Sequence, residues 1–553
     1  MSLPDRRIGL LFAVFAIAIV AAALRAGWVG VVRADELREV AATQQEATVT
    51  VPARRGTIED AHGLDLAVSQ PAASIAATPY LVEDAAAVAK RLAPLLRRDE
   101  DRLLRKLVRR DTGFVYLARG VPARRARKVE RLGVPGLEFI PEFRRVYPRE
   151  WMASQLLGTV GVEQRGLAGL EYSLDDHLRG TDGTRRLVKD ALGDPIELRD
   201  RERTVPGRDV RLTIDTRIQE RAEAVLAQVG VDWQPRAATA IVMEPNTGAV
   251  LAIANWPQVD ANRPSDAPDY AKINRAGAAT YEPGSTFKAF TVAAALEENL
   301  IDPGTTFSLP PTITVADREI HESHPRGHAT FTTRQILEQS SNVGAVKIGL
   351  IVGAKRFDEW IKRFGFGQAT GSGLPGEERG IVLPLEKYSG STMGNLPIGQ
   401  GIAVTPMQMA AAYAAIANGG MLRAPHVVAA VDGQRVKSAP GHRILRRETA
   451  GALREMLEGV LGPGGTASGA AIDGYELGGK TGTAQKVDEE TGTYSETEYV
   501  ASFVGFAPAK RPKLLVSVMV DEPKGDIYGG AVAAPAFKEI TSFALNYLRI
   551  APE

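Results

Sequence analysis

Two residues three positions apart, Ser285 and Lys288, have the types and spacing for nucleophilic catalysis. Pro283 and Gly284 interrupt the chain just before them, and an apolar helical run follows as far as Glu298. We therefore expect Ser285 at or near a helix N-terminus with Lys288 on the same face. A serine hydroxyl becomes a good nucleophile when a base takes its proton, and a lysine can be that base once burial and nearby cations lower its pKa. The helix N-terminus would also offer N–H groups to a developing oxyanion.

Two further motifs carry groups that such a mechanism could use. Ser340-Ser341-Asn342 is the only Ser-x-Asn in the chain and precedes an apolar helical stretch at 343–352. Lys480-Thr481-Gly482-Thr483 is the only Lys-Thr-Gly, and its glycine would let another backbone approach a cation and two hydroxyls. Each motif alone also has an ordinary structural interpretation, as a helix N-cap for the first and a strand edge or turn for the second.

In this order the three motifs make the chain resemble the penicillin-recognising serine enzymes. Over nearly its whole length the chain resembles the class B penicillin-binding proteins in particular. That resemblance rests on Arg55-Gly56-x-Ile58-x-Asp60-x-x-Gly63-x-x-Leu66-Ala67-x-Ser69, Arg145-x-Tyr147-Pro148, Gly166-x-x-Gly169-x-Glu171, Gly399-Gln400-Gly401-x-x-Val404-Thr405-Pro406 and Ala501–Phe506. Ser502–Phe506, Val520–Pro523 and Gly529–Pro535 are most similar to the division-specific FtsI type. One departure is Ala61-His62, where the family usually has Arg-Asn.

The resemblance implies a serine-type peptidoglycan D,D-transpeptidase. Ser285 would attack the carbonyl of the penultimate D-Ala of a stem peptide ending in D-Ala-D-Ala, and Lys288 would take its proton. Ser340 would pass a proton to the departing amine, while Asn342 would orient Lys288 and the substrate amide. An amine of a neighbouring stem would then resolve the acyl-enzyme and form a cross-link.

The third motif and two backbone groups complete the implied site. Lys480, Thr481 and Thr483 would bind the terminal carboxylate as the stem lies along the strand edge, where Gly482 allows close approach. The N–H groups of Ser285 and Thr483 would form the oxyanion hole. A β-lactam would acylate the same serine, and neither a cofactor nor a metal ion is implied.

An apolar run near the N-terminus predicts a membrane anchor. From Ile8 to Leu24, 17 small or apolar residues follow one another, and the apolar character resumes through Val32. A helix from 8 to 32 would be about 37 Å long, enough to cross a hydrocarbon core of about 30 Å. Arginines at positions 6 and 7 predict a cytoplasmic N-terminus and an extracytoplasmic remainder, single-pass in a bacterial inner membrane. A cleaved signal peptide, the alternative, has a shorter apolar region followed by small residues.

After the apolar run, the sequence first favours mainly strands and then, in its second half, both helices and strands. Residues 33–50 are polar and helix-friendly, two amphipathic helices are expected at 85–96 and 100–109, and 184–212 is β-rich. After a helical stripe that starts near Asp215, apolar runs at 238–243 and 249–254 predict a hairpin. Strands at 501–506 and 514–520 precede a closing helix at about 534–548.

We therefore expect an α/β (α+β) protein of three parts. Residues 1–32 would be the cytoplasmic tail and transmembrane anchor, and 33–210 an elongated, β-rich, non-catalytic pedestal of the dimerisation type. Residues 211–553 would be a transpeptidase domain like those of penicillin-binding proteins and serine β-lactamases, with a mainly antiparallel sheet packed by helices.

Composition and the context of two other motifs argue against other classes of function. The 553 residues hold 67 Lys plus Arg, 66 Asp plus Glu and no Cys, which excludes thiol chemistry and gives no bulk case for nucleic-acid binding. We interpret the Arg-rich stretch 97–128, with its interleaved acids, as a solvated helical face. Gly474–Thr481 fits the P-loop pattern but lacks the preceding strand and following helix. His321–His328 holds three of the seven histidines, yet Pro325 and Gly327 favour a polar loop near the active-site mouth.

Several roles stay open at this point. The expected partners are peptidoglycan stem peptides, β-lactams, a membrane glycosyltransferase of the FtsW/RodA type and other divisome proteins. Septal synthesis is favoured over an elongation-specific class B transpeptidase on the C-terminal strands alone. The chain could instead act chiefly as a scaffold that activates a membrane glycan polymerase. A β-lactamase or carboxypeptidase would send water to the acyl-enzyme, and the anchor and pedestal weigh against both.

Overall fold

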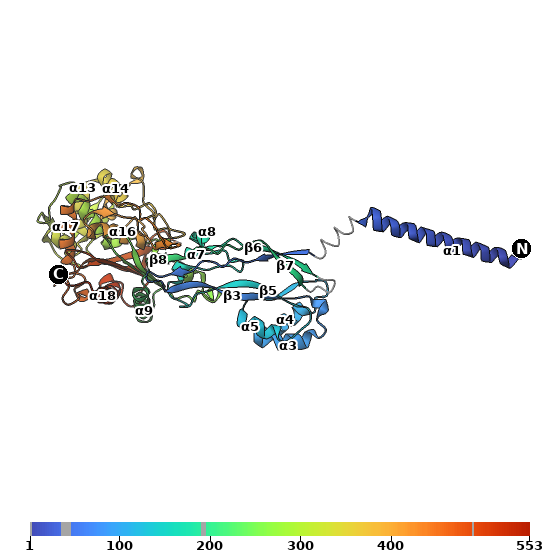
Figure 1. Ribbon diagram of the computed structural model, residues 1–553. Coiled ribbons are helices and arrows are strands. Elements are labelled where there is room, and N and C mark those ends of the chain that lie inside the picture. The colour runs from blue at the N-terminus through green and yellow to red at the C-terminus, as the bar shows by residue number, and fades with distance from the viewer. Residues whose placement is uncertain (1–2, 35–45, 190–194, 489–490, 553) are drawn as a thin grey trace.

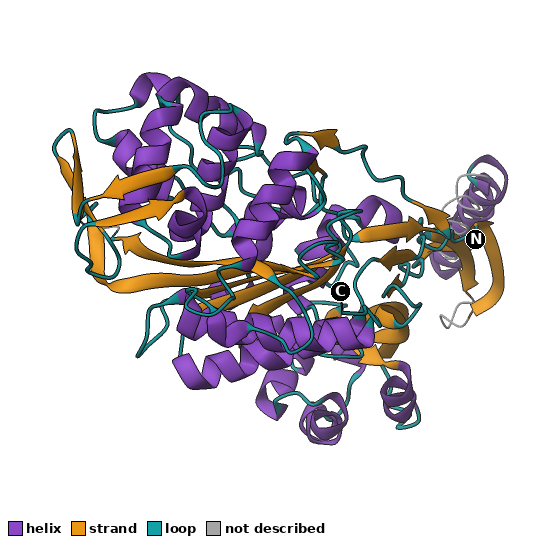
Figure 2. Ribbon diagram, turned by 90° about the vertical axis from the view of Figure 1, so that its left-hand side faces the viewer, coloured by secondary structure: helices purple, strands orange, loops and turns teal. Residues whose placement is uncertain are grey.

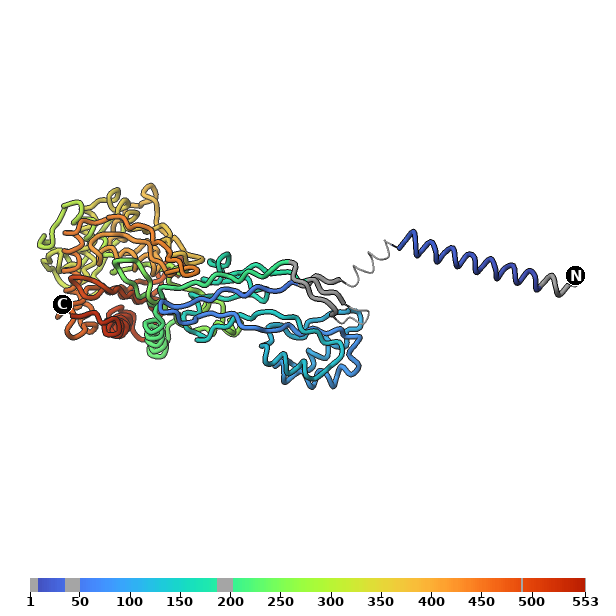
Figure 3. Tube along the Cα trace, in the orientation of Figure 1, coloured from blue at the N-terminus to red at the C-terminus, as the bar shows by residue number. Residues whose placement is uncertain are grey.

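The protein is elongated, with an anchor helix at one end and its largest globular part at the other (Figure 1). The computed structural model describes residues 3–34, 46–189, 195–488 and 491–552. The Cα trace runs from the N-terminal helix through a narrow middle part into the C-terminal half (Figure 3). The mixed architecture confirms the fold class expected from the sequence.

The N-terminal helix has the length and composition of a membrane span. Helix α1 (Leu3–Gly27) continues into a π-helical turn, η1 (Trp28–Val32). Within it, Ile8–Val32 has a mean hydropathy of 2.5 and is not buried against the rest of the protein. The helix-friendly stretch that follows does not continue to residue 50, because Glu46–Val51 is strand β1, paired with β6 (Gly183–Lys189). Residues 35–45 lie outside the described residues.

The pedestal consists of antiparallel strands and a small helical lobe. Strand β3, thirteen residues long, pairs with β4 on one side and β5 on the other, and β1, β6 and β7 form a separate sheet. The helical lobe, residues 85–136, packs α3, α4 and α5 against β3 and β4. The bounds are β2 (Ile58–Glu59), β3 (Asp65–Ala77), α3 (Ala85–Leu96), α4 (Glu100–Leu107), β4 (Val115–Pro122), α5 (Ala123–Glu130), β5 (Leu137–Val146), α6 (Ser154–Leu157), α7 (Gly169–Ser173), α8 (Asp175–Leu178), β7 (Pro195–Glu202) and β8 (Val210–Leu212). Both predicted amphipathic helices are confirmed, the second ending two residues early.

A buried ion cluster holds three distant pedestal segments together. Glu171 is fully buried, and the Nε atoms of Arg55 and Arg145 donate to its two carboxylate oxygens at 2.7 and 2.6 Å. Arg55 Nη2 also donates to the Glu171 carbonyl oxygen, and Arg145 Nη1 donates to the carbonyl oxygen of Gly56. A buried charge is tolerated only when it is paired and hydrogen-bonded. Removal of the shared carboxylate would therefore leave Arg145 without its acidic partner and Arg55 with Asp175 alone.

The C-terminal half is built on a five-stranded antiparallel sheet in the order β10-β9-β21-β20-β19. Helices α9 and α18 cover one face, and α16 lies on the other together with α11 and α17, so the sheet lies between helical layers (Figure 2). The strands are β9 (Ala237–Met243), β10 (Val250–Trp256), β19 (Gly478–Val487), β20 (Tyr494–Ala507) and β21 (Leu514–Asp521). The helices are α9 (Thr216–Trp233), α10 (Arg275–Ala278), α11 (Lys288–Glu297), α12 (Thr333–Glu338), α13 (Asn342–Val352), α14 (Ala354–Arg363), α15 (Thr392–Asn395), α16 (Pro406–Ala417), α17 (Arg447–Glu458) and α18 (Gly529–Tyr547). Short strands complete it: β11 (Thr306–Leu309), β12 (Thr312–Val315), β13 (Arg318–His321), β14 (Ala329–Thr332), β15 (Met421–Leu422), β16 (Val428–Val431), β17 (Gln434–Arg435) and β18 (His442–Arg443).

Helix α18 starts five residues before the expected position. The sequence places Pro535 in a first turn, but the helix begins at Gly529 and contains this proline. The early start follows from close packing, because a Cβ on Gly529 would lie 2.3 Å from the carbonyl oxygens of Gly482 and Ser502. The predicted hairpin β9–β10 is confirmed.

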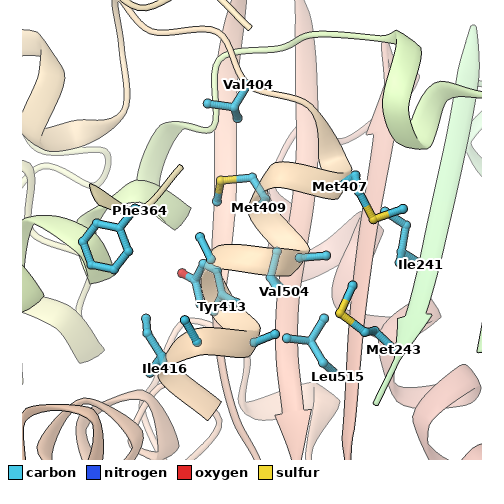
Figure 4. Close-up of a cluster of buried hydrophobic side chains, with 14 of the residues drawn as sticks. Ile241, Met243, Phe364, Val404, Met407, Met409, Tyr413, Ile416, Val504 and Leu515 are labelled. Atoms are coloured by element: carbon cyan, nitrogen blue, oxygen red, sulfur yellow. The ribbon is translucent and has the colours of Figure 1, made fainter. Parts of the chain in front are cut away.

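Alternation along the strands assigns their side chains to the two cores. Ile241 and Met243 of β9 lie with Val504 and Leu515 on the face that packs against α16, where Tyr413 is fully buried (Figure 4). The intervening small residues of β9 belong to the opposite core, under α9 and α18. This period of two is the expected pattern for a sheet buried on both faces.

The pedestal and the C-terminal half share one sheet. Strand β8 pairs with β2 of the pedestal on one side and with β16 on the other, within the order β17-β16-β8-β2-β3-β4. The division of the chain at residue 210 therefore stays a prediction, since it falls inside β8.

The ion cluster gives a test of pedestal stability. Glu171→Ala should destabilise the protein by about 3–5 kcal/mol, because it leaves the buried guanidinium of Arg145 without its acidic partner and removes one of the two carboxylates that pair with Arg55. Glu163→Ala, which removes the exposed partner of Arg119, should cost less than about 1 kcal/mol. Chemical denaturation of the two variants measures the difference; equal midpoints would contradict the role of the cluster.

Candidate active site

Ser285 lies in a short 3-10 turn that is fixed on both sides. The turn, η5 (Gly284–Phe287), leads directly into α11, which begins at Lys288. Gly284 has a φ of +53° and donates its N–H to the carbonyl oxygen of Gly399. The hydroxyl of Tyr413 donates to the carbonyl oxygen of Thr286 at 2.6 Å. The serine is therefore presented at a broken helix start, as predicted.

Lys288 is fully buried one helical turn behind the serine. Its Nζ donates to the carbonyl oxygen of Ser340 and to Oδ1 of Asn342, both at 2.6 Å, and lies 3.2 Å from Ser340 Oγ. Burial lowers the pKa of Lys288 to about 7; the charge of Glu322 opposes this shift and that of Arg326 adds to it. A neutral amine has two N–H groups, and the two short hydrogen bonds use both. Its lone pair therefore points away from these two acceptor oxygens and can take up a proton. The structure therefore holds a lysine that can accept a proton near neutral pH.

The three residues of the Ser-x-Asn segment make different contacts. Ser341 is the N-cap of α13, accepting from the N–H of Gly344 at 2.9 Å. Ser340, at a φ of +54°, turns its carbonyl oxygen and hydroxyl toward Lys288. The N-cap interpretation therefore holds for Ser341, while the other two residues of the motif, Ser340 and Asn342, contact Lys288.

Glu322 is a site residue that the sequence did not indicate. Its buried carboxylate accepts from the hydroxyl of Ser341 at 2.5 Å and from the N–H of Asn342 at 2.7 Å. The side chain of Asn342 also donates to the carbonyl oxygen of His321. Glu322 therefore fixes the segment that holds Lys288. Its only signal in the sequence is its place in the histidine-rich segment 321–328.

The Lys-Thr-Gly motif lies on β19, at the edge of the five-stranded sheet. Lys480 is fully buried, and burial, aided by the charge of Lys288, lowers its pKa well below the usual range. Its Nζ contacts Thr481 Oγ1 at 3.3 Å, and that hydroxyl lies 3.0 Å from Thr466 Oγ1. A Cβ on Gly482 would lie 2.3 Å from Ser502 Oγ and 3.0 Å from the carbonyl oxygen of Pro283, so the close approach inferred from this glycine is present.

One cavity of about 560 Å³ connects these groups. Ser285, Ser340, Asn342, Thr481 and Thr483 all line it, while the two lysines lie buried behind its wall. Ser323 and His324 also line the cavity, which confirms the polar loop expected at its mouth. Since Lys480 belongs to a strand, the helix that a P-loop requires is not formed there.

Comparisons with known proteins agree with this geometry. Residues 238–542 match the penicillin binding protein transpeptidase domain, and residues 50–212 match the penicillin-binding protein dimerisation domain. The chain is 33% identical to the peptidoglycan D,D-transpeptidase FtsI of Escherichia coli, over 96% of this chain and 90% of that protein. This chain is a class B penicillin-binding protein of the FtsI type.

Other relatives support the same family. The probable peptidoglycan D,D-transpeptidase PenA of Neisseria meningitidis is 33% identical over 98% of this class B penicillin-binding protein and 93% of the relative. The crystal structure of penicillin-binding protein 3 of Mycobacterium tuberculosis, complexed with aztreonam, matches with a TM-score of 0.72 and 29% identity, over 91% of this chain and 98% of that one. The chain is therefore a transpeptidase of the acyltransferase type, and its apolar N-terminal helix fits a membrane anchor.

The lysine environment predicts the pH dependence of acylation. The charged groups that act on Lys288 are Glu322 and Arg326. Because only the neutral amine can accept a proton, the rate constant for acylation by a fluorescent penicillin should fall about tenfold per pH unit below pH 7 and level off above it. Gel fluorescence after short exposures at pH 5 to 9 measures this profile; a flat profile would contradict a proton-accepting Lys288.

A pair of substitutions separates the two effects of Glu322. Glu322→Ala removes both hydrogen bonds to the Ser340–Asn342 segment and should slow acylation at least tenfold at pH 8.5. Glu322→Gln can still donate to Ser341 and accept from Asn342, so its rate at pH 8.5 should stay within about threefold.

Glu322→Gln also removes a negative charge that favours protonated Lys288, so the midpoint of the pH profile should move below that of the unsubstituted protein. Glu319→Ala, at an exposed position of β13, is the matched control and should change neither quantity. Equal rates for the alanine and glutamine variants would show that the contacts of Glu322 do not position the site.

Proposed function

We propose that this protein cross-links peptidoglycan stem peptides during septal wall synthesis, with Ser285 as the nucleophile. The single observation that carries the assignment of the residues is the arrangement around Lys288, whose two N–H groups are engaged by Ser340 and Asn342 beside a serine one turn away. In the first step Ser285 Oγ attacks the carbonyl carbon of the penultimate D-Ala, and its proton moves to the lone pair of Lys288.

The collapse of the tetrahedral intermediate needs a proton at the leaving nitrogen. Ser340 Oγ, 3.2 Å from Lys288 Nζ, relays it: the hydroxyl gives its proton to the departing amine and regains one from Lys288. The C–N bond breaks, D-Ala leaves, and the acyl group stays on Ser285. An amine of a second stem then attacks the ester carbon and loses its proton along the same relay. The bond between the carbonyl carbon and Ser285 Oγ breaks, and the serine oxygen takes up that proton from Lys288.

The edge of β19 suits the recognition of the donor stem. Since β19 ends the sheet order, its outer edge can pair with an extended peptide. Thr483 Oγ1 accepts from the N–H of Gly529 at 3.1 Å, so its own proton can be donated to the terminal carboxylate of the substrate, together with Thr481 and the charge of Lys480. The N–H groups of Ser285 and Thr483 hold the oxyanion that develops during attack.

The anchor determines where this reaction takes place. Arginines 6 and 7 before the apolar run favour a cytoplasmic N-terminus, so the site acts outside the inner membrane in a single-pass protein. A membrane glycan polymerase of the FtsW/RodA type and other division proteins would be its partners, because cross-linking needs newly made glycan strands. The name of the E. coli relative, FtsI, supports septal over elongation-specific work.

Labelling with a fluorescent penicillin tests the nucleophile. The full chain should bind one label, and mass spectrometry should find it on the peptide that contains Ser285. Ser285→Ala should lose the label and the cross-linking activity while keeping the thermal midpoint within a few degrees, because the side chain is small and half-buried. Ser323→Ala, at another hydroxyl that lines the cavity, should keep both. A label on any other residue would contradict the mechanism.

A further inference from the structure

The near-neutral total charge of the chain conceals one strongly basic part. The helical lobe, residues 85–136, contains 15 Lys plus Arg and 5 Asp plus Glu, a net charge of +10. The whole chain carries only +1, so the other residues together carry −9 (1 minus 10). A local excess of this size creates a positive potential that the averaged composition does not reveal.

The acids of the lobe are largely committed to local structure. Asp99 caps α4, and Glu100 and Asp101 lie in its first turn, where negative charge stabilises the helix N-terminus. Asp111 pairs with Arg109. The fifth acid, Glu130, ends α5, whose other charged residues are all basic.

The basic side chains of α5 form one surface. Arg124, Arg127, Lys128 and Arg131 are exposed, and together with Arg125 they line a shallow surface depression of about 730 Å³. Arg98, Arg102 and Lys106 line a second hollow beside strand β4. Within the described part of the chain, the ion pairs of the lobe engage Arg109 and Arg119 alone among its fifteen cations.

The lobe lies at the end of the pedestal where the chain arrives from the anchor. The strands show this directly: Ala77, at the far end of β3, precedes the lobe, and Leu137, its partner on β5, follows it. Strand β1 enters the pedestal at Glu46 from the same end, which faces α1 (Figure 1). Ala34 and Glu46 are twelve residues apart, a distance that the chain can span over at most about 43 Å.

We propose that the helical lobe docks on the anionic headgroups of the membrane that α1 crosses. This inference rests on the membrane anchoring stated under the proposed function. Clusters of Lys and Arg next to a membrane span bind anionic lipid by electrostatic attraction, which acts over about 10 Å at 0.1 M salt. The short connection to α1 keeps the lobe close to the bilayer, so the effective concentration of headgroups at the lobe is high. Docking fixes the membrane-proximal end of the pedestal and thereby the height of the active site.

Energy transfer from the lobe to the bilayer tests this docking in the full chain. Because the protein has no cysteine, Ala86→Cys at an exposed position of α3 gives a single site for a donor dye. The labelled protein is reconstituted into phosphatidylcholine vesicles with or without 30% phosphatidylglycerol, each containing an acceptor-labelled lipid. Transfer should be at least twofold higher with phosphatidylglycerol and should fall to the phosphatidylcholine level in 0.5 M salt.

Two matched charge variants identify the surface. Replacement of Arg124, Arg127, Lys128 and Arg131 by Gln should abolish most of the lipid-dependent increase. Replacement of Lys355, Arg435, Lys437 and Lys513 by Gln, four exposed cations of the C-terminal half, should leave it unchanged. Both variants should retain penicillin labelling.

Control measurements separate this proposal from the proposed function. Flotation with both kinds of vesicle checks the anchor, and fluorescent-penicillin labelling checks the active site. Equal transfer in the two vesicles from a protein that floats and labels would overturn docking on lipid. Salt-sensitive binding of soluble polyglutamate without any lipid dependence would also overturn it, because the lobe would then be a site for an acidic polymer.

Discussion

The burial of one lysine amine is the constraint on which the active site depends. Lys288 Nζ reaches no solvent, and its pKa near 7 corresponds to about 5 kcal/mol less stabilisation of the charged form than in water. Two acceptor oxygens engage its N–H groups, which leaves the lone pair for chemistry. Ser340 must adopt a left-handed φ to direct its carbonyl oxygen at this amine. Glu322 and the N-cap Ser341 hold the backbone in that conformation.

A second lysine, Lys480, is also fully buried at the active site. Burial lowers the pKa of Lys480, and the charge of Lys288 favours the neutral form of Lys480 further. Such a pair is unfavourable in the empty protein and becomes favourable when a carboxylate arrives beside Lys480. The unfavourable burial is offset by large cores on both faces of the sheet, where β9 and β21 are almost entirely buried. The pKa values of the base and of the lysine that would meet the substrate carboxylate are thus both lowered mainly by burial.

Local sequence signals predicted the parts of the site that lie on single elements. Pro-Gly punctuation and periodicity placed Ser285 and Lys288 at a helix start and the Ser-x-Asn motif before a helix. For Lys480 they left a strand edge or a turn open, and the structure has the edge strand β19. The site residue Glu322 was missed because its role depends on a contact across 20 positions, with Asn342. Likewise, the pairing of β8 with β16 joins residues more than 200 positions apart, and the start of α18 depends on the approach of Gly529 to Gly482. Tertiary packing decides such features, and a single sequence does not display it.

The same shared sheet connects the two ends of the protein mechanically. Strand β3 extends over about 43 Å from the helical lobe to the level of β2, which pairs with β8, and β8 pairs with β16 of the C-terminal half. The buried cluster of Arg55, Arg145 and Glu171 locks the strands near this junction. A hinge at the junction would have to break backbone hydrogen bonds and expose paired charges, so the pedestal transmits orientation as a stiff element. Any contact that fixes the lobe relative to the membrane therefore also determines where Ser285 meets the wall.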